Sequence, residues 1–302
     1  MIQQRLDIAI GLIFYQGKVL VGWRTAKQHQ GNKYEFPGGK VESGETALQA
    51  CRREIKEEVG LDLELWHPVD VIAHVYPDLA VHLHVFHSSI DAQQLASITA
   101  PWTWYSRQQL PELNFPAANQ SIIQRLLWPH FIKISTVISD LALLQADHLL
   151  YWRIDPAEFD PALLLGYSES QLQQLMLNIE CWRLLSQELQ AQVKTIHLKQ
   201  HQLLAAQPAD IPRLHRVIAA CHDQVAIAHA QQVGVEAILL SPVHSTATHL
   251  DAAALGWGCF AQWASQVQIP VYALGGMQKT DLQRVQAHHG YGVAGISGFE
   301  SS

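Results

Sequence analysis

The chain has 302 residues, 48% of them hydrophobic, so it can bury one large core or two ordinary ones, and its length favours two domains. Its net charge is −7, with 11 basic and 13 acidic residues in 1–130 and 9 and 14 in 131–302, so neither half has the basic excess that nucleic-acid binding requires. Its four cysteines lack CxxC spacing and no apolar run approaches the ~18 residues of a membrane span, which predicts a cytoplasmic protein with reduced thiols and no membrane partner.

Two strand-like runs open the chain, at 7–15 and 18–24, and Gln16-Gly17 joins them as in a hairpin. A turn rich in Gly and Pro follows at 31–40 and leads into a helix. A second pair of strands at 69–76 and 80–90 and a short amphipathic helix at 119–127 complete a mixed α/β unit that ends near residue 130. We therefore predict one domain over 1–130 and a second over 131–302.

The second half alternates between strand-like and helix-like segments, which favours a parallel sheet or barrel. Its strand-like segments are 148–154, 174–178, 193–199, 216–222, 237–243, 271–276 and 292–298.

The helix after the first turn is unusually acidic on one side. Glu54, Glu57 and Glu58 fall within about one third of its circumference. The apolar stripe lies roughly 120° away and consists of Leu48, Ile55 and Val59. Like charges at this spacing cost a few tenths of a kcal/mol, and acids near the helix C-terminus oppose the macrodipole.

A hard divalent cation would reverse this penalty, because Mg²⁺ prefers carboxylate oxygens and keeps positions open for water and phosphate. The alternative is a solvated charged face on which Arg52, Arg53 and Lys56 pair with the acids. The helix alone leaves both interpretations open.

The spacing around the helix matches all nine fixed positions of a known motif. Gly39 is followed after five residues by Glu45, and after seven more by the run Arg53-Glu54-Ile55-Lys56-Glu57-Glu58-Val59-Gly60-Leu61. This is the Nudix box, G-x5-E-x7-R-E-U-x-E-E-x-G-U with U apolar, so the first half resembles the Nudix hydrolases. The resemblance implies an α/β/α sandwich that holds Mg²⁺, with Mn²⁺ as the alternative, over a nucleoside diphosphate linkage.

The resemblance also assigns roles to the residues of the box. The metal ligands would be the Gly39 carbonyl and the carboxylates of Glu54, Glu57 and Glu58. Arg53 would orient the acids and Glu45 would support the loop, while Glu54 or Glu57 would position or deprotonate the attacking water.

Most of 1–130 is similar to the mutator-type (MutT) subfamily, whose substrate is 8-oxo-dGTP. The similarity rests on Arg24, "NKYEFPGGK" (32–40) and "FPAANQSII" (115–123). It implies that Phe36 packs on the purine, that Asn119 reads the purine edge with its amide, and that Arg24 and His29 flank the nucleotide. Phe36 could instead be ordinary core, and Asn119 could be the N-cap of the following helix.

Two departures from the subfamily concern possible substrate contacts. The segment 95–104 offers no acid where members can carry an extra metal or base group, and Leu79 stands where members carry a basic residue. The helix would then have to supply the base alone.

Residues 148–299 resemble the thiamin phosphate synthases, which implies a (β/α)8 TIM-barrel-like domain, shortened here because about 170 residues is few for that fold. By this resemblance Gly275, Gly276, Ser297 and Gly298 would bind a phosphate through backbone amides, although tight turns also explain glycines. The family's two acids and a lysine are replaced by Ile179, Gln202 and His249. We expect a barrel without synthase activity that retains a pocket for a phosphorylated ligand.

The sequence thus predicts an α/β protein that cleaves a nucleoside triphosphate to the monophosphate and pyrophosphate, with 8-oxo-dGTP as the expected substrate. The alternatives are a Nudix hydrolase of another pyrophosphate, such as a thiamin-pathway intermediate, and a metabolite sensor whose barrel regulates the Nudix domain.

Overall fold

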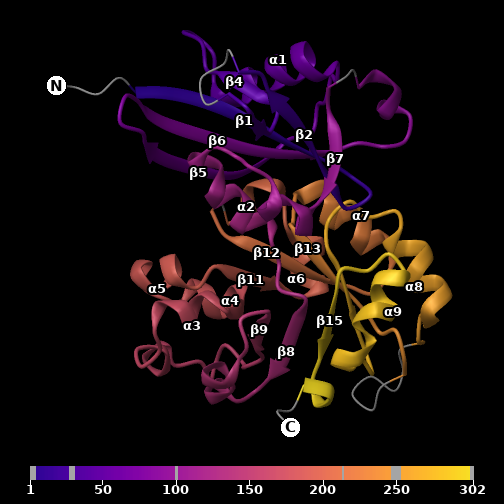
Figure 1. Cartoon of the computed structure of the whole chain (residues 1–302). Helices are drawn as coiled ribbons and strands as arrows, with labels where there is room; N and C mark the ends of the chain where they lie inside the picture. The colour runs from indigo at the N-terminus through magenta and orange to yellow at the C-terminus, as the bar shows by residue number, and fades with distance from the viewer. Residues whose placement is uncertain (1–4, 27–30, 99–100, 213, 246–252, 300–302) are drawn as a thin grey trace. The chain divides into compact units, whose positions relative to one another are not determined.

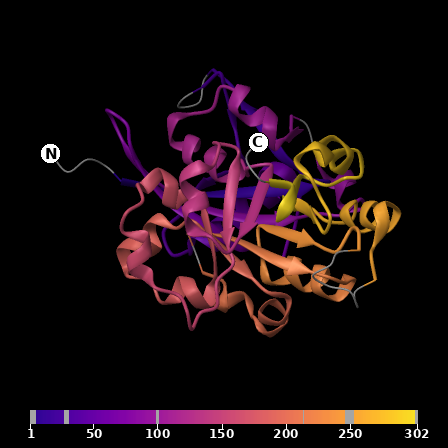
Figure 2. The ribbon, with the colours of Figure 1, turned by 90° about the horizontal axis from the view of Figure 1, so that it is seen from below.

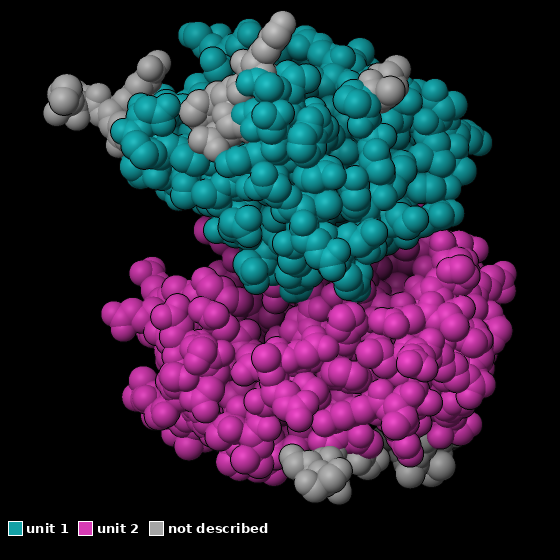
Figure 3. Space-filling view, viewed as in Figure 1, with its two compact units in different colours: residues 1–127 teal, residues 128–302 magenta. Residues whose placement is uncertain are grey.

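The computed structural model describes residues 5–26, 31–98, 101–212, 214–245 and 253–299. The chain forms two compact units, residues 1–127 and 128–302 (Figures 1 and 3). The sequence placed the boundary three residues later. Trp128 and Pro129 join the second unit because their carbonyls accept hydrogen bonds from the hydroxyls of Tyr291 and Tyr272.

The first unit is built on a seven-stranded sheet with the order β3-β2-β1-β6-β5, to which β4 and β7 are added by pairing with β1 and β2. The strands are β1 (Arg5–Tyr15), β2 (Lys18–Arg24), β3 (Lys33–Glu35), β4 (Gly38–Lys40), β5 (His67–Val75), β6 (Ala80–Ser89) and β7 (Thr103–Ser106). Its helices are α1 (Ala47–Val59) and α2 (Gln120–Leu126).

Strand β1 shows why this sheet is covered on both faces. Ala9 and Ile13 point into a core with Ile55 of α1. The alternate residues of β1 point into a second core with Ile122 of α2. Because successive side chains of a strand face opposite sides, a strand buried on both faces reads as a continuous apolar run. The layers are helix, sheet and helix, as the sequence predicted.

Helix α1 begins and ends at strong local signals. Thr46 accepts from the Gln49 amide at 3.2 Å while the Gln49 side chain accepts from the Thr46 amide at 2.8 Å, which forms a capping box. Gly60 ends the helix in the left-handed conformation, with φ of 84°. Ile55 and Val59 are buried as expected, but the prediction for Leu48 was wrong. Leu48 is exposed, because Ala50 and Cys51 fill the first turns of the buried face.

The second unit is a closed barrel of eight parallel strands in the order β10-β11-β12-β13-β14-β15-β8-β9. The strands are β8 (Phe131–Ser135), β9 (His148–Trp152), β10 (Leu175–Asn178), β11 (Thr195–Leu198), β12 (Arg216–Cys221), β13 (Ala237–Leu240), β14 (Val271–Leu274) and β15 (Gly292–Gly295). The sequence identified seven of these segments and passed over β8, which closes the barrel between β15 and β9.

The barrel is shortened in its helices and keeps all eight strands. The helices lie outside the strands (Figures 1 and 2), and α7, the longest of those described in this unit, has 10 residues. They are α3 (Glu169–Gln173), α4 (Ile179–Arg183), α5 (Gln187–Gln192), α6 (Gln200–Ala205), α7 (Gln224–Val233), α8 (Gly256–Ala264) and α9 (Leu282–Ala287). No helix in the described part of either unit is long and apolar enough to cross a membrane.

His197 of β11 is a buried group whose charge the barrel cannot accommodate. It is 4% exposed, and neither ring nitrogen has a hydrogen-bond partner among the described residues. Burial, together with the nearby Lys199 and His222, lowers the pKa of His197 to about 3. The imidazole is therefore neutral in the folded barrel at any pH near 7.

We expect the free energy of unfolding of the barrel to fall as the pH drops below 6.5. The unfolded chain protonates His197 near pH 6.5 and the folded chain does so only near pH 3, so the stability is complete above pH 6.5 and declines by about 1.4 kcal/mol per pH unit below it. Urea titrations of the full chain at pH 7.5 and 5.0, followed by hydrogen exchange of barrel peptides, would measure this. His197→Leu should remove about 2 kcal/mol of the difference; an unchanged pH dependence in the variant would refute the assignment.

Candidate active site

The guanidinium of Arg53 ties together the acids of helix α1 and the preceding loop. Its Nη2 lies 2.7 Å from Glu45, and its Nη1 lies 2.8 Å from Glu54 and 3.3 Å from Glu57. It also donates to the carbonyl of Lys40 at 3.1 Å. These contacts hold the pKa of Arg53 above its usual range and that of Glu45 below it. Arg53 thus contacts Glu45, Glu54 and Glu57 at once, as the predicted orienting role requires.

Glu54 lies directly against Gly39 of β4. A Cβ placed on Gly39 would come within 2.2–2.5 Å of the carbon and both oxygens of the Glu54 carboxyl group, so only glycine leaves room for it. The Glu54 side chain is 16% exposed, whereas that of Glu57 is 60% exposed. The structure therefore brings together two of the groups assigned to the metal, the backbone of Gly39 and the Glu54 carboxylate.

Glu58 lies beside the same strand. Its Oε2 accepts a hydrogen bond from the Gly38 amide at 3.1 Å. Partial burial, followed by the charges of Glu35 and Glu54, raises the pKa of Glu58 to about 7 despite the Gly38 amide, although the residue keeps an exposed surface. Its ionised form is thus disfavoured mainly by burial and further by the charges of Glu35 and Glu54, and a nearby cation would oppose both effects.

These residues fit a divalent cation by their chemistry. No three His, Cys, Asp or Glu side chains in the described ranges converge into a ready-made metal cluster, because Arg53 holds Glu54 and Glu57 and the Gly38 amide holds Glu58. The donor atoms are nevertheless carboxylate oxygens and a carbonyl, which Mg²⁺ and Mn²⁺ prefer. A bound cation would stabilise the ionised forms of both Glu57, which is largely exposed, and Glu58.

A cavity of about 350 Å³ adjoins this acidic platform and shares Gly38 and Gly39 with it. Its polar lining comes from Arg24, Glu35, Lys40, Tyr76 and Asn119. The remaining lining is mostly apolar and consists of Leu6, Ile8, Ile10, Phe36, Leu79, Val81, Leu83, Pro116 and Ala118. An apolar slot with a few polar groups next to an acidic platform suits a base whose phosphates extend over the acids.

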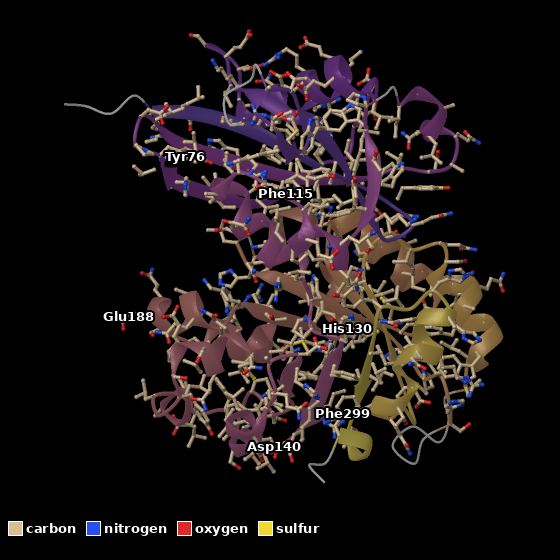
Figure 4. All side chains as sticks on the ribbon, viewed as in Figure 1. Tyr76, Phe115, His130, Asp140, Glu188 and Phe299 are labelled. Atoms are coloured by element: carbon tan, nitrogen blue, oxygen red, sulfur yellow. The ribbon has the colours of Figure 1, made fainter. Side chains whose placement is uncertain are left out.

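Asn119 has its side-chain amide available in this cavity. It occupies the N-cap position of α2, but its side chain makes no capping hydrogen bond, and it is 7% exposed. The segment that carries it is held by Tyr76 (labelled in Figure 4), whose hydroxyl accepts from the Ala118 amide at 3.1 Å. The Asn119 side chain therefore does not cap helix α2.

Phe36 takes a core position as well as a place in the cavity wall. It is fully buried and stacks on Phe115 (labelled in Figure 4), with ring centroids 4.8 Å apart and an interplanar angle of 25°. Phe36 is therefore a core residue that also lines the cavity, and its packing on a purine stays a prediction. Of the other residues predicted to bind nucleotide, Arg24 lines the cavity, and His29 lies outside the described residues.

Sequence reasoning missed Glu35, although it stands next to Phe36 in the motif segment. Its Oε2 lies 3.1 Å from Arg24 Nε, its side chain is 22% exposed, and burial raises its pKa against the opposing effect of Arg24. The signal that could have revealed it is an acid placed between two aromatic residues, Tyr34 and Phe36, in a short strand.

In the barrel, a closed amide pair occupies one of the positions where the synthase resemblance expects an acid. The Asn178 amide donates to Gln202 at 2.8 Å, and the Gln202 amide donates back at 3.1 Å. Ile179 at the other such position is buried. Neither side chain can contribute a carboxylate to a metal. His249 lies outside the described residues.

The glycines assigned to a phosphate in the barrel also have packing roles. Gly275 and Gly276 have φ of 105° and 68°, and a Cβ on Gly275 would lie 2.9 Å from Pro242. A Cβ on Gly298 would lie 2.6 Å from the carbonyl oxygen of Met277. Tight turns therefore account for these glycines, and phosphate binding by Gly275, Gly276, Ser297 and Gly298 stays a prediction.

Comparisons with known proteins agree with both halves of this description. A family model described as NUDIX domain matches residues 9–125, and one described as Thiamine monophosphate synthase matches residues 184–299. The chain is 33% identical over 125 residues to the 8-oxo-dGTP diphosphatase of Escherichia coli (strain K12), covering 41% of this chain and 97% of the relative. It is 29% identical over 122 residues to the CTP pyrophosphohydrolase of the same organism, covering 39% and 86%.

The barrel has a relative that it matches over a shorter stretch. It is 35% identical over 78 residues to the putative thiamine-phosphate synthase 2 of Aquifex aeolicus (strain VF5), covering 26% of this chain and 42% of that protein. The first unit matches its first relative almost from end to end, with the box residues in place around β4 and α1. The chain belongs to the Nudix pyrophosphohydrolase family through its first unit, which is joined to a thiamine-phosphate synthase-like barrel.

Proposed function

We propose that the first unit is a Mg²⁺-dependent nucleoside triphosphate pyrophosphohydrolase whose substrate is 8-oxo-dGTP. One observation carries this proposal: the base-sized apolar cavity and the acidic platform share Gly38 and Gly39, so that a base in the cavity directs its phosphates toward Glu54 and Glu58. The relatives named 8-oxo-dGTP diphosphatase support the choice of base.

The chain's own groups would divide the work as follows. The Gly39 carbonyl and the carboxylates of Glu54, Glu57 and Glu58 would hold Mg²⁺. When bound, this ion would neutralise phosphate oxygens and help ionise the attacking water. Arg53 keeps Glu54 in place, and Glu54 or Glu57 would take the proton of the water as it attacks phosphorus.

The cavity would bind the base. Asn119 offers an acceptor and a donor, which match the N7–H and O6 of 8-oxoguanine; ordinary guanine has an acceptor at N7 instead of a donor. Leu79, Val81 and Leu83 line the slot with apolar side chains, which would exclude water around a bound base. Discrimination against dGTP would therefore depend on position 7, where 8-oxoguanine donates a hydrogen bond to Asn119 and guanine cannot.

The barrel, by contrast, would have lost the synthase reaction. The Asn178–Gln202 amide pair and the buried Ile179 support this, since the synthase resemblance requires carboxylates there to hold a metal on a pyrophosphate. A separate cavity of about 750 Å³, lined in part by Arg153, Lys199 and His222, supports the retention of a phosphorylated ligand in the barrel.

A substrate panel on the full chain tests the proposal. Release of pyrophosphate from 8-oxo-dGTP, dGTP, CTP and hydroxymethylpyrimidine pyrophosphate would be measured with Mg²⁺ and with EDTA. We expect kcat/KM for 8-oxo-dGTP to exceed that for dGTP by at least about 100-fold, and EDTA to abolish all turnover. A preference for CTP or for the pyrimidine pyrophosphate would refute the proposed substrate. Addition of thiazole phosphate should not accelerate consumption of the pyrimidine pyrophosphate, since an active synthase would join the two.

A further inference from the structure

Glu35 lines the base cavity with most of its hydrogen-bonding capacity unused. It ends strand β3, immediately before Phe36, and lines the same cavity as Asn119. In the described part of the chain, its side chain makes one polar contact, the ion pair of Oε2 with Arg24 Nε at 3.1 Å. That contact does not have the geometry of a good hydrogen bond, since Arg24 Nε is left without a hydrogen-bond partner. The Oε1 atom is free to accept from a ligand.

The position of this carboxylate calls for a donor on the ligand. Ile8, Leu79 and Val81 make much of the cavity wall apolar, and the cations that line it with Glu35 are Arg24 and Lys40. An ionised carboxylate accepts hydrogen bonds and donates none. Charge-assisted bonds of this kind are roughly twice as strong as neutral ones. The ligand edge that faces Glu35 should therefore carry N–H donors and no acceptor.

A guanine-type base presents such an edge. Its N1–H and 2-amino group lie side by side, and both are donors, whereas adenine and cytosine present a ring-nitrogen acceptor at the corresponding place. The opposite edge of the same base carries O6 and position 7, which the Asn119 amide can read. The Glu35 carboxylate and the Asn119 amide line one cavity, so each would bind one edge of a single purine.

We propose that Glu35 is a specificity-determining residue that accepts hydrogen bonds from the N1–H and 2-amino group of a 2-amino-6-oxopurine. This inference rests on the proposed function and deepens it. Asn119 would distinguish 8-oxoguanine from guanine through position 7, and Glu35 would distinguish a guanine-type base from adenine and cytosine. The charge of Arg24, 3.1 Å away, partly offsets that of the carboxylate.

The test compares two substrates that differ only in the 2-amino group, 8-oxo-dGTP and 8-oxo-dITP. In the wild-type full chain we expect kcat/KM to be about 10- to 100-fold higher for 8-oxo-dGTP, because loss of the amine leaves a buried acceptor unpaired. In Glu35→Gln, which is nearly isosteric, the preference should fall to less than about 3-fold, with most of the change in KM. Thermal melting would verify that the variant is folded.

A merely structural role for Glu35 predicts a different result. If Glu35 only holds Arg24 in place, Glu35→Gln lowers kcat/KM for both substrates by the same factor and the preference is unchanged, which would overturn the inference. Equal use of the two substrates by the wild-type enzyme would also overturn it and leave the proposed function standing. If the wild-type enzyme hydrolyses neither substrate, the proposed function fails and the inference fails with it. Glu112→Gln, the same change at an exposed acid that does not line the cavity, should retain the wild-type preference.

Discussion

Glu54→Gln is expected to lower kcat for the preferred nucleotide by about 10³-fold or more while the protein remains folded. The change keeps the size of the side chain but removes the charge that faces Gly39, both as a cation ligand and as a base for water. The Arg53–Glu54 ion pair is only partly buried, so its loss should lower the melting temperature by no more than a few degrees. Steady-state kinetics and calorimetry would measure the two effects separately.

The same change at two other acids provides the comparison for Glu54→Gln. Glu57→Gln should cost less than Glu54→Gln, about 10- to 100-fold, because Glu57 is mostly exposed and touches Arg53 only at 3.3 Å. Glu64→Gln makes the same chemical change at an exposed acid outside the box and should leave kcat unchanged. Wild-type turnover in Glu54→Gln would contradict both the metal platform and the mechanism.

Gly39→Ala is expected to reduce kcat by about 100-fold through Glu54 alone. The backbone of Gly39 is not in the left-handed region, so alanine meets no strain there, but its Cβ would occupy the place of the Glu54 carboxyl group. That group is the end of a flexible side chain and can move aside, so stability should change little. A displacement of about 1 Å in a positioned catalytic group can cost 10²-fold.

A double-variant cycle tests this route. Because Gly39→Ala acts by displacing Glu54, Gly39→Ala combined with Glu54→Gln should be no slower than Glu54→Gln alone. Additive losses would mean that Gly39 contributes independently, through its carbonyl or through the strand. Gly166→Ala is the matched control, since a Cβ there meets nothing within 4 Å and φ is unremarkable; it should leave kinetics and melting unchanged.

Local signals in the sequence were sufficient for the elements around the active site. Thr46 and Gln49 start α1 and Gly60 ends it through hydrogen bonds and backbone conformations that involve only neighbours in the chain. The spacing of Gly39, Glu45 and Arg53 likewise predicted the loop and helix that carry the acids. Alternation of strands and helices predicted a parallel sheet or barrel, because it follows from the periods of 2 and 3.6 residues, and the resemblance to the thiamin phosphate synthases pointed to the barrel.

Longer-range features needed the tertiary structure. Strand β8 was not among the predicted strands. Its place in the barrel is shown by its pairing with β9, the next strand in the chain, and with β15, the last one. The reciprocal pair of Asn178 and Gln202 joins residues 24 positions apart. Leu48 is exposed because the sheet accepts the smaller Ala50 and Cys51 instead, a matter of packing that helical periodicity does not specify.

The sequence by itself thus determined the family, the acidic helix and the kind of chemistry, since these depend on residue types at short, fixed separations. The tertiary structure alone decided which cavity adjoins those acids and that Glu35 lines it together with Asn119. The reason is physical: the cavity forms where β1, β3, β6 and the segment before α2 meet, and residues far apart in the chain become neighbours only when the cores on both faces of the sheet are packed.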